Sequence, residues 1–157
     1  MMKTLQITES NARKLYNDAT PEFKTTLEDT FGKEFFSQKI TDRVKTYRDA
    51  CHETGETPII EENMRVAGFT EDEINYRKLK TITKALNEGW VPDWTDDDES
   101  KWIPWFGWSS SGFAFCDTDC SYSHTDAGNG SRLCFKSDEL ATYAGKQFAD
   151  IYKGFMF

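Results

Sequence analysis

The chain has 157 residues, 38% of them hydrophobic, and a formal net charge of −8 at pH 7. This length and apolar content predict a single domain, residues 1–157, with a core of its own. We expect neither a membrane span nor a secretory signal, because there is no apolar run of about 18 residues and no apolar segment after the first lysine. We therefore expect a cytoplasmic protein whose four cysteines stay reduced.

Two helices are predicted near the start of the chain. Thr8 has the residue type and position of an N-cap, and Ala12, Leu15, Tyr16 and Ala19 would form the apolar side of the helix that it starts. Thr20 and Pro21 are typical of the cap and first residue of a second helix, with Gly32 behind its last turn.

Two further helices are predicted up to Gly89, which makes residues 1–89 mainly helical. Apolar residues recur at helical spacing from Ile40 to Cys51 and lead to a glycine at position 55. Thr70 and Glu73 form a capping box, in which each side chain satisfies the other residue's free backbone amide.

A tryptophan-rich, acidic segment follows at residues 90–112. It contains all five tryptophans, in GWVPDWTDDDESKWIPWFGW. Residues 93–126 hold eight carboxylates against Lys101 alone, a net charge of −7. Sites for single-stranded nucleic acid combine stacking rings with a positive groove, so we do not expect direct nucleic-acid binding through this segment.

The last part of the chain, residues 113–157, is predicted to be ββα. Strands are expected at 113–116 and 132–136, joined by a long polar loop that contains the turn signal Asn129-Gly130. Ser137 then caps a final helix. The fold class is therefore α+β: a helical N-terminal part of about four helices, packed with a C-terminal β-hairpin that is followed by a helix.

Cysteine and histidine near the predicted strands supply the ligand types of a zinc site. Cys116, Cys120, His124 and Cys134 have the spacing C-x3-C-x3-H-x9-C, which departs from the tight C-x2-C pairs of recognisable zinc sites. The alternative is that Cys116 and Cys134 are small core residues and the other two lie in a loop. We favour this alternative and expect no metal.

No motif for catalysis or for a cofactor is found. The chain lacks a phosphate-binding or dinucleotide-binding glycine pattern, and no serine lies in a nucleophile elbow. The sequence therefore favours a protein that is not an enzyme and has no cofactor.

The five tryptophans divide into two expected groups. Trp90 follows a helix end, and the pair Trp105-Phe106 lies between a proline and a glycine, so these rings are expected to pack inward. Trp94, Trp102 and Trp108 have polar neighbours and are expected to be partly exposed. Aromatic rings with an acidic rim are typical of a binding surface, for which the candidate residues are Trp94, Asp96, Asp97, Asp98, Trp102, Trp105 and Trp108.

Four segments carry a resemblance to a known group of proteins. They are ITESNARKLYNDATPEFKTTLEDTFGKEFFSQKITDRVKTYRDAC, KALNEGWVPDW, KWIPWF and GSRLCFKSDELATYAGKQFADIYKGFMF. Through them nearly the whole chain resembles small uncharacterised proteins encoded by Bacteroidales gut bacteria and their phages, including crAss-like phages. The resemblance implies a phage or mobile-element product, in the bacterial cytoplasm or as a minor virion-associated component. It implies no activity or catalytic residue.

Two functions are consistent with these observations. The first is a non-enzymatic interaction module, a phage accessory or minor virion-associated protein that holds a protein partner, such as a basic one, through the tryptophans and their acidic rim. The second is a carbohydrate binder or weak hydrolase with tryptophans as platforms and Asp93, Asp96 or Asp117 as hydrogen-bonding or catalytic acids. Two acids in one cleft would distinguish the second from the first.

Overall fold

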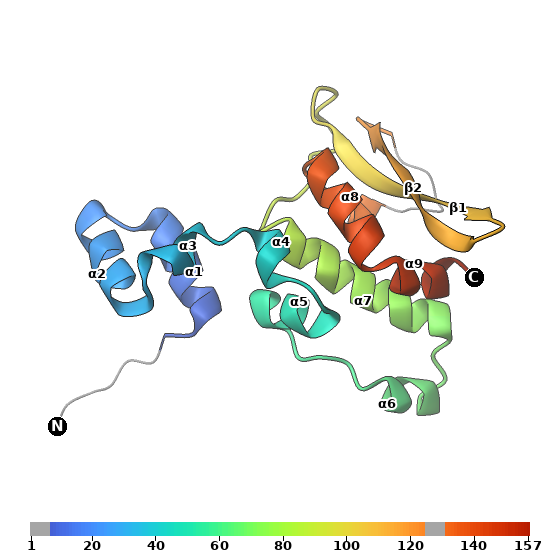
Figure 1. The fold of residues 1–157 in the computed structure, drawn as a ribbon, viewed down its shortest axis with the longest axis horizontal. Coiled ribbons are helices and arrows are strands. Elements are labelled where there is room, and N and C mark those ends of the chain that lie inside the picture. Colours follow the sequence, from blue (N-terminus) through green and yellow to red (C-terminus); the bar gives the residue numbers. More distant parts are fainter. Residues whose placement is uncertain (1–6, 125–130) are drawn as a thin grey trace.

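The computed structural model describes residues 7–124 and 131–157. Helices form the N-terminal part, a two-stranded antiparallel hairpin follows and helices end the chain, so the predicted α+β class is confirmed (Figure 1). The elements are α1 (Glu9–Asp18), α2 (Pro21–Phe31), α3 (Lys33–Ser37), α4 (Ile40–Arg43), α5 (Tyr47–Thr54), α6 (Glu61–Val66), α7 (Glu71–Leu86), β1 (Lys101–Ser109), β2 (Gly112–Ser121), the 3-10 turn η1 (Ser131–Leu133), α8 (Asp138–Gln147) and α9 (Ala149–Met156).

The predicted caps of α1 and α2 are confirmed. The Thr8 hydroxyl accepts a hydrogen bond from the amide of Asn11, and the Thr20 hydroxyl accepts one from the amide of Phe23. Gly32 ends α2 with a φ of 85°, a conformation that a side chain would make unfavourable. Local sequence signals therefore set both helix starts.

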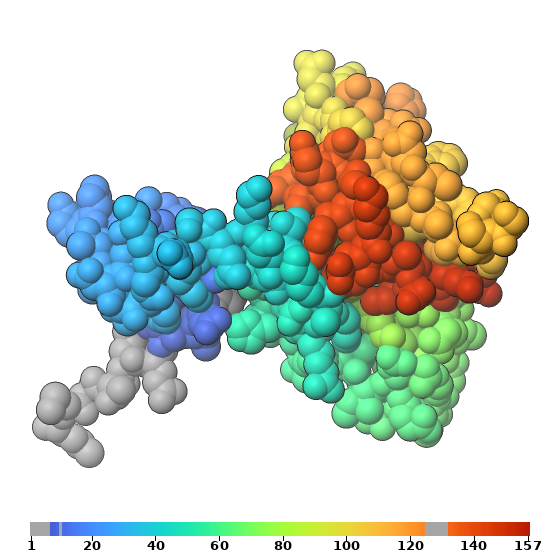
Figure 2. All heavy atoms as spheres, in the orientation of Figure 1, coloured from blue at the N-terminus to red at the C-terminus, as the bar shows by residue number. Residues whose placement is uncertain are grey.

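Helices α1 to α3 project from the rest of the molecule (Figures 1 and 2). Aromatic rings hold them together: Tyr16 stacks on Phe36 with centroids 4.1 Å apart, and Phe35 contacts Phe31 and Phe36. Arg13 of α1 donates to the carbonyl of Phe35, and its side chain lies over the Phe35 ring at 3.6 Å. The short α3 was not predicted.

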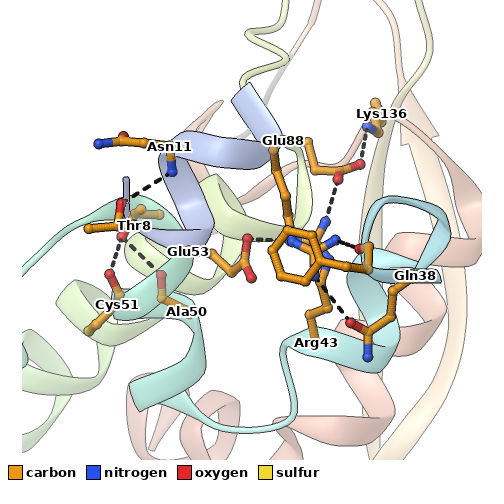
Figure 3. A network of polar contacts seen from close by, with 12 residues as sticks. Thr8, Asn11, Gln38, Arg43, Ala50, Cys51, Glu53, Glu88 and Lys136 are labelled. Atoms are coloured by element: carbon orange, nitrogen blue, oxygen red, sulfur yellow. Dashed lines mark hydrogen bonds and ion pairs between the residues drawn. The ribbon is translucent and has the colours of Figure 1, made fainter. Parts of the chain in front are cut away.

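Ion pairs connect the segment after α3 to the main body. Arg43 donates to the carboxylates of Glu53 and Glu88, and Lys136 pairs with the other oxygen of Glu88 at 3.4 Å (Figure 3). Only 9% of the Arg43 side chain is exposed, so water screens these contacts less than it would at the surface. The end of α4, α5 and the turn after α7 thus meet at one guanidinium.

The single helix predicted over residues 40–55 is wrong, because two helices, α4 and α5, occupy this range. The Asp49 carboxylate accepts from the amides of Lys45 and Thr46, and the Thr46 hydroxyl accepts from the amide of Asp49. This capping box starts a new helix inside the apolar pattern. Gly55 ends α5 in the left-handed conformation, and the unpredicted α6 follows.

Helix α7 forms the centre of the core. Its predicted capping box of Thr70 and Glu73 is confirmed. After the last turn of the helix, Gly89 has a φ of 93°, which agrees with its predicted place at the helix end. The helix packs against α5 and α9. Buried side chains from α7, the C-terminal helices and the chain around Phe135 make the main cluster, which includes Leu79, Ile82, Leu86, Phe135, Leu140, Ala141, Ala144, Phe148 and Tyr152.

The predicted pairing of the hairpin is wrong. Strand β2 pairs with β1, from within the tryptophan-rich segment, and Ser109 lies opposite Gly112 at the turn. The Ser109 hydroxyl accepts from the amide of Ser111, and Gly112 has a φ of 106°, so the serine run and the glycine form a tight reversal. Residues 132–136 form no strand of the hairpin. The turn expected at Asn129-Gly130 lies outside the described residues.

The final helix predicted after Ser137 is present, but it breaks in two. The Ser137 hydroxyl accepts from the amide of Leu140 and starts α8 as predicted. At Phe148 the backbone leaves helical geometry, with φ −116° and ψ 25°, and α9 begins. Helix α8 packs on both strands, and α9 contacts β2 and α7. Within residues 7–124 and 131–157, no helix has both the length and the apolar character required to cross a bilayer.

Candidate aromatic and acidic interface

The hairpin has two different faces, because side chains alternate along a strand and residues directly opposite each other share a face. One face packs on the C-terminal helices: the Phe106 ring lies 4.8 Å from that of Tyr152, and Phe115 lies against Gly145. The other face carries Trp105 opposite Asp117, and Ile103 opposite Asp119. We call Trp105, Asp117 and Asp119 the acidic Trp105 face.

Trp105 lies on the surface, with 52% of its area exposed. The expectation that it packs into the core is therefore wrong, because Pro104 and Phe106 take the inward positions and alternation turns Trp105 outward. Asp117 and Asp119 are exposed beside it. In the part of the chain that the structure describes, neither carboxylate forms an ion pair.

The two carboxylates of this face cover the free edge of β2. Asp117 Oδ1 accepts from the amide of Thr118 at 2.9 Å, and Asp119 Oδ1 accepts from the amide of Cys120 at 2.8 Å. Negative charge on an edge strand discourages pairing with another strand. The acidic Trp105 face is therefore suited to recognition through side chains rather than to extension of the sheet.

A buried lysine organises the segment before β1. The Lys101 side chain is fully buried, and its Nζ donates to the carbonyl of Asp96 at 3.0 Å and pairs with Glu99 at 3.3 Å. It also lies 5.5 Å from the centre of the Trp94 ring. Glu99 in turn accepts from the indole of Trp90 at 3.1 Å. In the sequence Lys101 stands out only as one positive charge among acids, and nothing there indicates that it is buried.

The acid run lies at one end of the acidic Trp105 face. Lys101 points to the same face as Trp105, four residues or about 13 Å along the strand, and its ammonium holds the backbone of Asp96. Asp96, Asp97 and Asp98 are exposed. At the start of this run, the hydroxyl and amide of Thr95 donate to Asp93 and lower the pKa of that carboxyl below its usual value.

The remaining tryptophans lie elsewhere. Trp90, Trp94 and Trp102 are half-buried, and Trp102 packs against the core. Trp108 is 58% exposed, but it lies on the opposite side of the hairpin from Trp105, with its ring 5.6 Å from those of Phe113 and Phe157. The structure therefore divides the seven candidate residues into separate sites.

No protein-family model, curated protein or solved structure matches this chain.

The possible zinc ligands do not come together. Cys116 is exposed on β2, and its Sγ lies beside Gly107 of β1, 2.8 Å from where a Cβ would be. Cys134, in contrast, is buried, with 2% of its area exposed. His124 is within 3.3 Å of Ser123, and Cys120 is 3.9 Å from Tyr122. Among the described residues, no three histidine, cysteine or acidic side chains are close enough to hold a metal.

The carbohydrate or hydrolase alternative needs acids in a cleft. Acids do line grooves on the described part of the chain: one groove carries Glu53 and Glu88, and another carries Glu9, Asp42, Asp49 and Glu53. The acids expected for this alternative, Asp93, Asp96 and Asp117, line neither of them. Asp117 instead lies on strand β2, and Asp93 and Asp96 lie in the segment before β1, where all three are exposed.

Proposed function

We propose that this protein is a non-enzymatic interaction module that holds a basic segment of a protein partner against the acidic Trp105 face. The observation that carries the proposal is the exposed indole of Trp105 directly opposite the exposed carboxylate of Asp117. An arginine or lysine can lie over the ring while its charge meets the carboxylate. The ring contact at such an exposed site contributes about 0.5–1 kcal/mol.

Charge beyond the contact supports a basic partner. Asp96, Asp97 and Asp98 extend the negative surface from the end of this face, and the whole chain carries −8. A surface of one sign raises the rate at which an oppositely charged partner arrives, most strongly at low salt. Binding should therefore weaken as salt is added.

The cellular context of the module rests on the sequence resemblance alone. We propose an accessory or minor virion-associated protein of a Bacteroidales phage or mobile element, acting in the host cytoplasm. Nothing in the geometry of the hairpin depends on this context.

Anisotropy of fluorescein-labelled octa-arginine, titrated with the protein at low salt, tests the proposal. Trp105→Ala should weaken binding about two- to fivefold, and Asp117→Asn should have a similar effect. The matched control is Asp150→Asn, which removes one exposed carboxylate on α9. Equal losses for Asp117→Asn and Asp150→Asn would show that net charge alone attracts the peptide, and would overturn the proposed face.

A further inference from the structure

A groove runs along the C-terminal half of α7, and it shares no residue with the acidic Trp105 face. Its volume is about 340 Å³. Its lining includes two lysines of α7, two tryptophans of the segment after α7, and one arginine: Lys80, Lys84, Trp90, Trp94 and Arg132. This volume is near the lower end of the range for small-molecule sites, about 300–1,000 Å³.

The two indole rings are held in place before any ligand arrives. Trp90 Nε1 donates to Glu99, and Lys101 lies over the Trp94 ring at 5.5 Å. Pro92 lies between them in the sequence and restricts the backbone. Both rings are half-buried and line the groove, so each has both a fixed orientation and accessible surface. Fixed rings bind a planar group with a smaller loss of conformational entropy.

The groove is positive although the segment that forms one wall is acidic. Lys80 and Lys84 are four residues apart on α7 and therefore point to the same side. No carboxylate is among the described residues that line the groove. Lys84 pairs with Glu56 at 2.7 Å, whereas Lys80 and Arg132 form no ion pair within the described part of the chain. The Lys80 ammonium lies 5.1 Å from the centre of the Tyr76 ring and acts on Glu56 only at long range, so Lys80 and Arg132 can still meet an anion.

We propose that this groove binds a small anionic ligand that carries a planar ring, with nucleoside phosphates as its chemical class. The ring packs on Trp90 and Trp94, and the phosphate meets Lys80 and Arg132 at the rim. Aromatic stacking of a base contributes about 1–3 kcal/mol, and basic side chains are the usual partners of phosphate.

The size of the ligand follows from charge outside the groove. A long polyanion leaving the groove would meet a chain of net charge −8, with Asp96, Asp97 and Asp98 exposed beyond Trp94. Repulsion there opposes an extended nucleic acid, whereas a mononucleotide keeps its charge within the cationic rim.

Saturation-transfer NMR and calorimetry with AMP, adenosine and inorganic phosphate test this site. AMP should bind saturably, and adenosine and phosphate should each bind at least about tenfold more weakly, because each lacks one of the two contacts. Arg132→Ala and Lys80→Ala should each weaken AMP about threefold or more. The matched control, Lys33→Ala, removes an exposed lysine of α3 and should leave AMP binding unchanged.

Three outcomes would overturn the proposal. They are the absence of saturable binding for AMP, GMP and UMP, equal binding of AMP and phosphate, or binding of a decathymidylate with none of the mononucleotides. Circular dichroism checks that each variant folds, and Lys80→Gln replaces Lys80→Ala if the latter does not. The two proposals can fail separately, because the two sites share no residue. A protein that does not bind octa-arginine can still bind AMP in this groove.

Discussion

Trp102 and Phe135 exchange two backbone hydrogen bonds, with N to O distances of 2.9 and 2.8 Å. The bridge is isolated, since residues 131–133 form a 3-10 turn rather than a strand. It brings the chain before α8 against the start of β1. The segment around Phe135 therefore fixes one end of the hairpin while its ring fills the core.

Asn87 holds the same segment from the other side. Its Nδ2 donates to the carbonyl of Cys134 at 2.9 Å, and its Oδ1 accepts from the amide of Lys136 at 3.1 Å. Asn87→Ala should lower the free energy of unfolding by about 2–4 kcal/mol, because two backbone groups lose their partners at a buried position. Urea unfolding measures this free energy. Asn63→Ala, at an exposed position of α6, should change it by less than about 0.5 kcal/mol.

Gly145 allows α8 to approach the hairpin. A Cβ built at this position would lie 2.3 Å from Cδ2 of Phe115 and 3.0 Å from Cβ of Pro104. Gly145→Ala should therefore destabilise the protein by about 1–3 kcal/mol, even though alanine favours a helix by about 1 kcal/mol over glycine. Thermal unfolding measures the change. Adding Phe115→Leu should recover part of the loss, and stabilisation by Gly145→Ala alone would show that the two elements are not so close.

Replacement of Lys101 should disturb the segment before β1. Lys101→Met leaves Glu99 without its ammonium partner, and we expect a loss of about 1–3 kcal/mol, less than for a fully buried pair because 26% of the Glu99 side chain is exposed. Emission from Trp90 should shift to longer wavelength as its anchor loosens. Lys39→Met, at an exposed position, is the control. A double-mutant cycle with Glu99→Gln that gives no coupling would contradict the pairing.

Charged quenchers should distinguish the two exposed tryptophans. Trp105 lies opposite Asp117, whereas Lys153 lies 5.4 Å from the centre of the Trp108 ring. Caesium ions should therefore quench Trp105 better than iodide does, and iodide should be the better quencher of Trp108. Comparison of Trp105→Phe and Trp108→Phe with the parent protein isolates each signal. Equal quenching of Trp105 by both ions at low salt would remove the argument for a negative field at this face.

Helix starts were predictable because they depend on residues close together in the sequence. Thr8, Thr20 and Ser137 each cap a helix as predicted, through a side chain that accepts from an amide three residues later. In the predicted capping box of α7, the Glu73 carboxylate accepts from the amide of Thr70. Helix interruptions were less visible. The break at Thr46 lies inside an unbroken apolar pattern, which shows periodicity but not where the chain turns.

The strand pairing was not predictable from local signals. Residues 101–109 were not predicted as a strand, and they contain Pro104, a residue type that cannot donate to a ladder. Pro104 lies on the edge of the hairpin that faces away from β2, where no hydrogen bond to β2 is required. The cationic groove was not predicted either, because its residues are far apart in the sequence. Lys80 and Arg132 lie on either side of residues 93–126, the range over which charge was counted.

The buried thiol of Cys134 makes the free energy of unfolding depend on pH in the alkaline range. Burial raises the pKa of its thiol from 9.0 to about 11. Between these values the unfolded chain has released the proton and the folded chain still holds it, so the free energy of unfolding falls as pH rises from about 9 to 11. Below about pH 9 both states are protonated and the contribution is constant.

Cys134→Ala removes this contribution, so the difference in free energy of unfolding between parent and variant should shrink from about pH 9 to 11 in urea titrations. Tyrosines and lysines titrate in both proteins and cancel in the difference. Parallel stability profiles for the two proteins would show that the folded thiol titrates like an exposed one.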